Sequence, residues 1–318
     1  MSKVGTAEAE PGDRATGRLQ IGETSDGLSV ELPVAVINGA AGGPTIFIQA
    51  GSDGDELNGI GVIGRLYQAV DPAELAGEIR LIGVANWHAY QRAEHRNPID
   101  RTKLNRAFPG DPDGSSSERI AATIYEVATD ADLALDLHQG GTSRMIHEVR
   151  VRCGRHHDLH KDCLELARTF DCGYSLDQQG PDGQLARVLS DDGIPVIDPE
   201  LGGSVGWDMQ SIEIGLTGTM NVLKGYGLLE GQVEPGTQTR IGGFDQYQSP
   251  CGGLVHLEAD LGDSVDAGDP LYTVKTVFGE QRETVHAETD GIFWRTRRLP
   301  HVATGEYVCS VGIDVDEI

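Results

Sequence analysis

Short apolar segments alternate with helical segments through the first two thirds of the chain, and this order limits the possible folds more than any other feature. Residues 44–50 and 131–137 predict buried strands, because each is a short and largely apolar run. Residues 59–70 carry apolar side chains at helical spacing, and a serine-rich segment suited to begin a helix precedes residues 117–129. The alternation predicts an α/β fold with a mixed, mostly parallel sheet covered by helices on both faces. The same pattern continues in predicted strands at 78–85 and 194–197 and predicted helices at 158–170 and 208–226.

The pattern changes in the last quarter of the chain, where short strands separated by Gly and Pro replace the alternation. We therefore predict an α/β domain over residues 1–235 and a small all-β domain over residues 236–318. Within the second domain, residues 261–271 resemble the turn-rich half of a biotinyl/lipoyl-type β sandwich. The hairpin position that presents the acceptor lysine in such domains is Phe278 here, so we expect a structural or lid role instead of cofactor attachment.

Charge narrows the possible partners. The chain has 25 Lys and Arg residues against 50 Asp and Glu residues, which gives a formal net charge of -25. A general nucleic-acid binder is excluded, because such proteins need clustered basic residues to release counterions. An acidic surface poor in lysine is typical of proteins kept soluble by concentrated salt, which screens the self-repulsion. We therefore predict a halophilic protein, with an ordinary acidic protein as the alternative.

The remaining composition indicates a cytoplasmic location. The chain has no apolar run of about 18 residues, which excludes an integral membrane protein, and its first residues lack the apolar segment of a secretory signal. Five cysteines without a C-x-x-C pair predict reduced thiols instead of disulfides or a zinc ribbon. The expected partner is a small molecule, not a nucleic acid or a membrane, and a homo-oligomer is left open.

The segment GSDGDE, residues 51–56, follows the predicted strand at 44–50 and leads into a helix. Ligands of open α/β sheets bind at the carboxyl ends of strands, and glycines there allow close approach. Asp53 and Glu56 are three residues apart, so both carboxylates can converge on one cation. The alternative is a solvated turn with an acidic helix N-terminus.

His138 stands at the end of the predicted strand 131–137, in the segment DLHQGG. A histidine at the end of a strand, followed by glycines, is well placed as a metal ligand or as an acid–base group. Together with Asp53 and Glu56 it gives three protein ligands and room for a water, which is the arrangement of a catalytic zinc site.

Two further segments suit substrate binding and proton transfer. Residues 96–110 contain three arginines in a stretch rich in Pro and Asn, which suits forked recognition of a carboxylate. A surface loop paired with acidic residues is the alternative. Glu200 follows the predicted strand 194–197 and is placed to act as a general base.

The order of these motifs resembles the succinylglutamate desuccinylase/aspartoacylase family, whose fold is that of the zinc carboxypeptidases. The shared motifs are G-x-x-G-D-E, N-P-x-D-x-x-x-L-N-R-x-F-P-G, S-E-R-I-A, D-L-H and E-L-G-G. The resemblance runs from about residue 45 to about residue 225, and LNRAFPG at residues 104–110 is its most specific motif. It implies a metal-dependent hydrolase that cleaves the amide bond of an N-acyl amino acid or a related carboxylate-bearing amide.

The resemblance also implies the metal centre. In this family one Zn²⁺ is held by the His and Glu of an H-x-x-E motif and by a later His. The matching positions here are Asp53, Glu56 and His138.

Substrate and proton-transfer roles follow in the same way. The family's carboxylate-binding residues match Arg96, Asn105 and Arg106, and its general acid–base glutamate matches Glu200. Arg96 is in addition expected to stabilise the oxyanion that forms when water attacks the amide carbonyl.

One position departs from the family pattern, since Asp53 stands where the family has histidine. Two carboxylates and one imidazole leave a Zn²⁺ site without net charge, and a less positive centre is a weaker Lewis acid. Three outcomes are open: a hydrolase with altered metal preference, such as Mn²⁺, which accepts oxygen ligands; a slower zinc enzyme; or a fold that has lost its metal.

Other functions are also open. A metal-free binding protein could keep the arginine cleft and the β domain, and a metallocarboxypeptidase acting on peptides would use the same fold. The segment GGSVG at residues 202–206 matches the nucleophile elbow of serine hydrolases, but the histidines downstream of it all fall in the predicted β domain.

Overall fold

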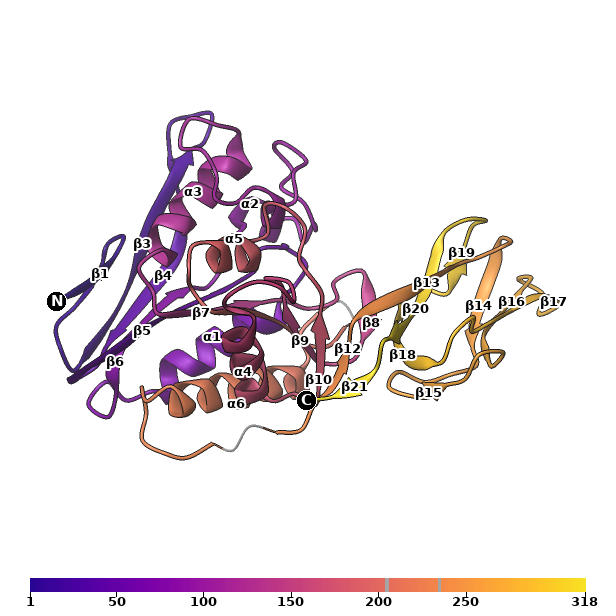
Figure 1. Ribbon diagram of the computed structural model, residues 1–318. Coiled ribbons are helices and arrows are strands. Elements are labelled where there is room, and N and C mark those ends of the chain that lie inside the picture. The colour runs from indigo at the N-terminus through magenta and orange to yellow at the C-terminus, as the bar shows by residue number, and fades with distance from the viewer. Residues whose placement is uncertain (204–205, 234–235) are drawn as a thin grey trace.

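The computed structural model describes residues 1–203, 206–233 and 236–318 of the chain (Figure 1). Within these residues the largest unit is a ten-stranded sheet that mixes parallel and antiparallel neighbours. In spatial order its strands are β21 (Asp316–Glu317), β12 (Thr239–Ile241), β10 (Tyr174–Asp177), β9 (Glu148–Val151), β11 (Val196–Glu200), β7 (Leu133–Leu137), β5 (Ala41–Ala50), β6 (Ala76–Ile82), β4 (Ser29–Asn38) and β3 (Asp13–Glu23).

Three parallel strands, β5, β7 and β11, are neighbours in the middle of this sheet. In their registers Ala50 lies opposite Leu137, and His138 forms a bridge with Glu200. The carboxyl ends of the three strands therefore meet at one edge of the sheet, where ligands of such folds bind. The predicted mixed α/β sheet is confirmed.

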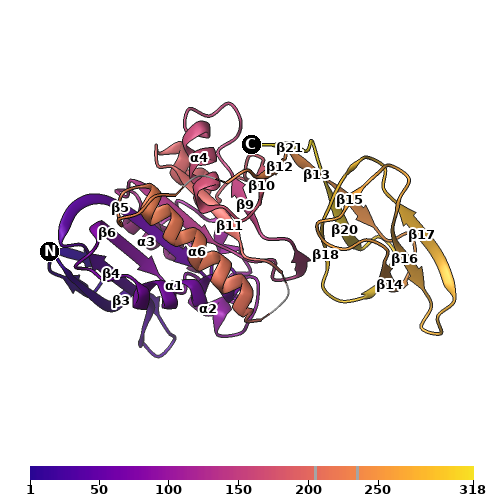
Figure 2. The same ribbon diagram turned by 90° about the horizontal axis from the view of Figure 1, so that it is seen from below.

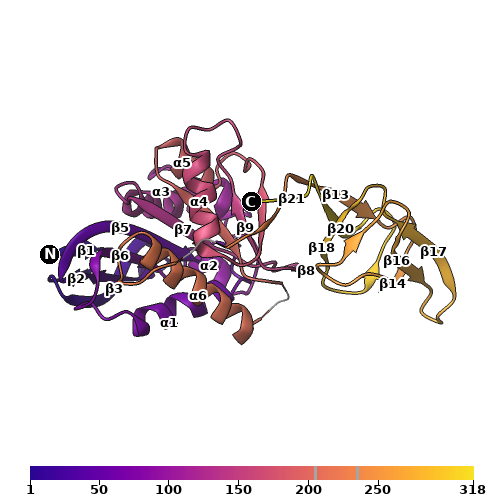
Figure 3. The same ribbon diagram turned by 60° about the horizontal axis from the view of Figure 1, so that its bottom comes forward.

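Helices cover both faces of the sheet (Figures 2 and 3). Apolar residues of α1 (Asn58–Ala69), α4 (His160–Phe170) and α6 (Met209–Gly225) form one core with the sheet. Residues of α3 (Ser116–Ala128) and α5 (Leu185–Asp191) form the second core on the opposite face, together with a hairpin of β1 (Ser2–Val4) and β2 (Ala7–Ala9).

Local sequence explains where the helix α3 begins. The Ser115 hydroxyl accepts a hydrogen bond from the Glu118 backbone amide, and the Glu118 carboxylate accepts one from the Ser115 amide. This reciprocal capping satisfies two amides that the helix itself cannot pair. The serine-rich segment thus starts the helix, as predicted.

The last part of the chain forms two small antiparallel sheets with their own apolar core. Phe278 lies in the turn between two of these strands and is 91% exposed. One sheet contains β13 (Gly243–Gln248), β20 (Tyr307–Ile313), β18 (Gly291–Arg297) and β15 (Ser264–Val265); the other contains β17 (Gln281–His286), β16 (Pro270–Lys275), β14 (Gly253–Leu257) and β19 (His301–Val302).

The two parts of the chain share strands. β8 (Ser143–Met145) leaves the large α/β unit and pairs with β18, while β12 and β21 return to the large sheet. The division into residues 1–235 and 236–318 stays a prediction, and residue 235 itself lies outside the described residues. Among the described residues, no helix combines the length and the apolar character needed to cross a membrane.

Candidate metal centre

The loops that follow β5 and β7 bring the three predicted metal ligands together. Nδ1 of His138 lies 2.9 Å from Oε2 of Glu56 and 3.9 Å from Oδ2 of Asp53. All three side chains are buried. Asp53 and His138 are 85 positions apart in the sequence, yet their donor atoms lie close together at the carboxyl edge of the sheet. A ligand is expected to bind at this edge.

Glycines shape the loop that carries Asp53. Gly51 has a φ of 72°, a conformation that glycine adopts without strain. A Cβ atom on Gly54 would lie 2.1 Å from the carbonyl carbon of Ala89, in α2 (Trp87–Tyr90). The loop can therefore pack against α2 only with glycine at position 54, and this packing holds Asp53 inside the protein.

Buried neighbours fix the ring of His138. Its Nε2 lies 3.0 Å from Oδ2 of Asp136 and 2.9 Å from Nδ2 of Asn105. Nε2 and Nδ1 thus each lie within hydrogen-bond distance of a carboxylate, Asp136 and Glu56 respectively. A metal ion would take the place of the proton on Nδ1, while Asp136 keeps the proton on Nε2, as in most metal-bound histidines. Burial lowers the pKa of His138, but the charges of Asp136 and Asp198 outweigh it and raise the pKa well above its usual value.

The carboxylates of this cluster fit a divalent cation. Oδ1 of Asp53 is buried without a hydrogen-bond partner among the described residues, and the nearest cation to its Oδ2 there is the Lys103 ammonium, at 2.9 Å. Burial, followed by the charge of Asp53, raises the pKa of Glu56 to about 7. Two buried carboxylates this close together are costly unless positive charge compensates them, and the single Lys103 ammonium does so only in part, so the donor set suits a divalent metal ion.

Two residues that the sequence analysis did not single out enter this cluster. Nζ of Lys103 lies 2.9 Å from Oδ2 of Asp53 and 3.0 Å from Nε2 of His95. Nε2 of His95 in turn lies 3.7 Å from Oδ2 of Asp53. Asp53 stands where the family pattern has histidine, which was a signal that could have pointed to Lys103 and His95. An additional buried negative charge requires a compensating partner.

Glu200 ends β11 on the same edge of the sheet. Its Oε1 forms an ion pair with Nη1 of Arg150 at 2.5 Å, while its buried Oε2 has no hydrogen-bond partner among the described residues. Burial raises the pKa of Glu200, but the positive charges of Arg150, His138 and Lys103 outweigh it and lower the pKa. Glu200 is therefore held ionised, with one oxygen available to accept a proton.

The predicted substrate-binding residues occupy different environments. Arg96 and Arg106 are exposed, and Nη1 of Arg96 donates to the backbone oxygen of Arg101 at 3.4 Å. Asn105 is buried, with its amide nitrogen beside His138 and its Oδ1 accepting from the backbone amide of Leu185 at 2.8 Å. The two guanidinium groups are thus accessible to a substrate, whereas the Asn105 side chain is engaged within the protein, where its amide nitrogen donates to Oδ2 of Asp136, the carboxylate beside His138.

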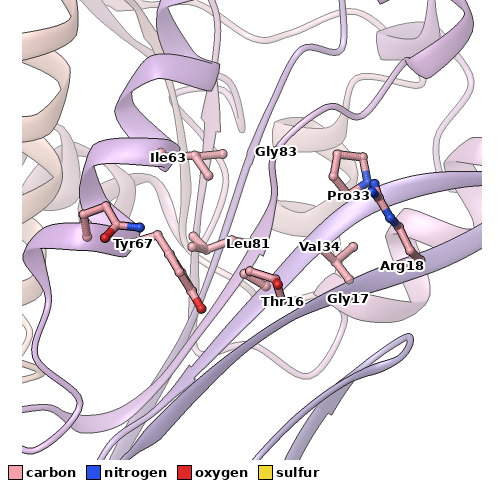
Figure 4. Close-up of a pocket in the computed structure, with 12 residues that line it drawn as sticks. Thr16, Gly17, Arg18, Pro33, Val34, Ile63, Tyr67, Leu81 and Gly83 are labelled. Atoms are coloured by element: carbon pink, nitrogen blue, oxygen red, sulfur yellow. The ribbon is translucent and has the colours of Figure 1, made fainter.

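The serine-hydrolase motif cannot be placed, and one large hollow of the described part of the chain lies away from the predicted site. Ser204, the nucleophile of that motif, lies outside the described residues. A hollow of about 520 Å³ between β3, β4 and α1 is lined by Ile63, Tyr67 and Leu81, among others, and contains none of the predicted site residues (Figure 4).

Known proteins resemble this chain over most of its length. Residues 42–226, more than half of the chain, match the model of the succinylglutamate desuccinylase/aspartoacylase catalytic domain. N-alpha-acetyl-L-2,4-diaminobutyric acid deacetylase of Halomonas elongata is 29% identical over 302 residues, which cover 91% of this chain and 88% of that protein.

Solved structures show the same similarity. A succinylglutamate desuccinylase from Silicibacter sp. TM1040 superimposes with a TM-score of 0.87 at 25% identity, covering 99% of this chain and 100% of that one. The product-bound ectoine utilization protein EutE (DoeB) of Ruegeria pomeroyi gives a TM-score of 0.86 at 25% identity, covering 98% and 100%. The chain belongs to the succinylglutamate desuccinylase/aspartoacylase family, as its motifs predicted.

Proposed function

We propose that this protein is a metal-dependent amidohydrolase that removes the acyl group from an N-acyl amino acid or a related carboxylate-bearing amide. The observation that carries the proposal is the convergence of Asp53, Glu56 and His138 beside Glu200 at the carboxyl edge of the sheet. Family membership supports the same chemistry, and neither a metal-free binding protein nor a peptide carboxypeptidase is favoured by the relatives.

Asp53, Glu56 and His138 would hold the ion. When bound, the ion would supply Lewis-acid chemistry, polarising the amide carbonyl and lowering the pKa of a water molecule. We propose Zn²⁺ as the natural ion, with Mn²⁺ as the alternative, because two of the three donors are carboxylate oxygens.

Glu200 moves the proton. Its unpaired Oε2 accepts a proton from the attacking water, and Glu200 then gives that proton to the amide nitrogen as the C–N bond breaks. Arg150 holds the other oxygen, so the carboxylate presents Oε2 in a fixed direction. The products are a carboxylic acid and a free amine.

The exposed arginines would bind the substrate. Arg106 forks onto the substrate carboxylate, and Arg96 stabilises the negative charge that develops on the carbonyl oxygen. Asn105, which the family pattern places in substrate binding, contributes here by donating to Asp136, the carboxylate that orients His138. Fixing the carboxylate at one end of the substrate places the scissile amide near the metal centre.

The relatives suggest the first substrate to test. The Halomonas elongata relative is named for its action on N-alpha-acetyl-L-2,4-diaminobutyric acid, and the alignment covers most of both chains. We propose an N-acetylated amino acid of this kind, with succinylated amino acids as the alternative class. The protein is further proposed to be cytoplasmic and halophilic, in keeping with its net charge of -25.

A metal-resolved activity screen tests the proposal. The purified chain is stripped with a chelator, reloaded separately with Zn²⁺, Mn²⁺, Co²⁺ or Mg²⁺, and assayed for free amine from a panel of acetylated and succinylated amino acids. We expect activity with at least one transition metal and none after stripping. A stripped protein with full activity, or a fully loaded protein inactive on the whole panel, would contradict the proposal.

A further inference from the structure

We infer that His95 is a fourth protein ligand of the metal ion, supplying the imidazole that position 53 lacks. This inference rests on the proposed function, because it concerns the same metal centre. One donor atom each from Asp53, Glu56 and His95 lie within 4.8 Å of one another. His95 therefore joins the cluster from a loop that the family motifs do not include.

The distances match those between ligands of one ion. Nε2 of His95 lies 3.7 Å from Oδ2 of Asp53, and Nδ1 of His138 lies 3.9 Å from the same oxygen. Two donors each bound at about 2.1 Å to a tetrahedral Zn²⁺ are about 3.4 Å apart. The two distances to Asp53 exceed this value by about 0.3 and 0.5 Å. Glu56 approaches His95 to 3.9 Å at Nδ1, so binding would also draw Nε2 of His95 towards Glu56 and His138.

The ring of His95 is oriented for ligation. Its Nδ1 lies 3.2 Å from Oδ1 of Asp55, which accepts the ring proton. Nε2 is then left with its lone pair towards Asp53. A carboxylate that holds the far nitrogen of a histidine is the usual support of a metal-bound imidazole. The His95 side chain is 29% exposed, so the ring is not sealed inside the protein.

A cation already lies between these donors. The ammonium of Lys103 contacts Oδ2 of Asp53 at 2.9 Å and Nε2 of His95 at 3.0 Å. The position therefore attracts positive charge, and a metal ion bound by both atoms displaces the ammonium. Lys103 is thus a competitor of the ion, whereas His95 is its ligand.

His95 changes the character of the centre. Without His95 the ion would have one imidazole and two carboxylates as ligands. With His95 it would have two imidazoles and two carboxylates. Nitrogen ligands favour Zn²⁺ over Mg²⁺ and Ca²⁺, and Zn²⁺ can expand to five ligands to admit a water. His95, 42 positions after Asp53, thereby supplies the nitrogen ligand that position 53 no longer provides.

Zinc affinity measured by competition with a chromogenic chelator tests the inference. The wild type is compared with His95→Ala, His95→Gln and, as a matched control, His88→Ala, which removes another partly buried histidine from the neighbouring helix α2. We expect the two His95 variants to bind Zn²⁺ roughly 10- to 100-fold more weakly and the control to be unchanged. Lys103→Met should bind more tightly than the wild type.

Two further readouts separate the possible results. Circular dichroism of the metal-free proteins shows whether each variant folds, and the visible spectrum of the Co²⁺-loaded forms responds to a change in coordination number and geometry. Wild-type affinity and an unchanged Co²⁺ spectrum in both His95 variants would overturn this inference alone. A wild-type protein that takes up no metal would overturn the proposed function with it.

Discussion

The indole nitrogen of Trp294 donates a hydrogen bond to Oε2 of Glu148, which joins the C-terminal β unit to the large sheet. Both residues are fully buried. Oε1 of Glu148 accepts from Nε of Arg150 at 2.6 Å, and Nη1 of Arg150 pairs with Glu200 at 2.5 Å. A continuous polar chain thus runs from the β unit to the proposed proton carrier.

Replacing Trp294 by phenylalanine should therefore affect both stability and catalysis. The Trp294→Phe variant leaves one oxygen of a buried carboxylate unpaired, which costs about 1–3 kcal/mol of unfolding free energy. We expect kcat to fall and KM to change little, because Glu200 loses part of its support while the substrate-binding arginines are untouched. Urea unfolding and steady-state kinetics measure the two effects.

Phe244→Leu is the control, since Phe244 packs against the Trp294 ring without a polar contact to Glu148. A loss of the same size in kcat for both variants would indicate packing alone.

Glu200→Gln removes the proton carrier and keeps its shape. We expect kcat to fall by roughly 10²- to 10⁴-fold, the usual contribution of a general acid–base group. Metal content measured by mass spectrometry should stay at the wild-type level, because Glu200 is not among the proposed ligands. Glu126→Gln, an exposed change on helix α3, is the matched control and should behave as the wild type. Unchanged turnover in Glu200→Gln would remove this residue from the mechanism.

Asp53→His restores the ligand that the family pattern has at this position. We expect the ratio of activity with Zn²⁺ to activity with Mn²⁺ to rise, because imidazole suits Zn²⁺ and carboxylate oxygens suit Mn²⁺. The ratio is measured on stripped and reloaded protein at equal metal occupancy. A ratio equal to that of the wild type would show that position 53 does not contact the ion.

The ion pair between Arg240 and Asp316 should make stability depend on pH. A hydrogen bond from Arg240 lowers the pKa of Asp316 below its ordinary value of 3.8. Since the folded chain binds this proton less readily than the unfolded chain, the stabilisation is complete above that value and is lost as the pH falls through the folded-state pKa. Arg240→Gln should therefore melt below the wild type at neutral pH, with the difference in Tm shrinking in acid. A difference that stays constant down to strongly acidic pH would contradict this account.

The net charge of -25 predicts a response to salt. Molar KCl shortens the screening length to about 3 Å, which relieves repulsion between acidic side chains on the surface. We expect the Tm to rise as KCl is added from dilute buffer to molar concentration. A Tm that falls steadily with KCl would contradict the halophilic proposal.

Much of the fold could be predicted because it depends on local patterns. The apolar runs that became β5 and β7 stand out from their surroundings, and since parallel strands end at one edge, the positions of Asp53, His138 and Glu200 in space followed from their positions after strands. The long strands β3 and β4 were not predicted, because β3 mixes polar, charged and glycine residues with the apolar ones and β4 contains a proline, which is uncommon within strands.

The parts of the site that the sequence did not predict depend on contacts between residues far apart in the chain. Lys103 and His95 reach Asp53 across 50 and 42 residues, and no spacing rule connects them. The hydrogen bond between Trp294 and Glu148 spans 146 residues and exists only because β8 and β18 pair. Such contacts are fixed by tertiary packing, which periodicity and motifs do not describe.

Anomalous diffraction at the zinc edge from crystals grown with Zn²⁺ tests the metal centre most directly. The account predicts one strong peak at about 2 Å from donor atoms of Asp53, Glu56 and His138, with the Lys103 ammonium moved away from Asp53. A map without a peak there, with Lys103 still paired to Asp53 at saturating zinc, would contradict it.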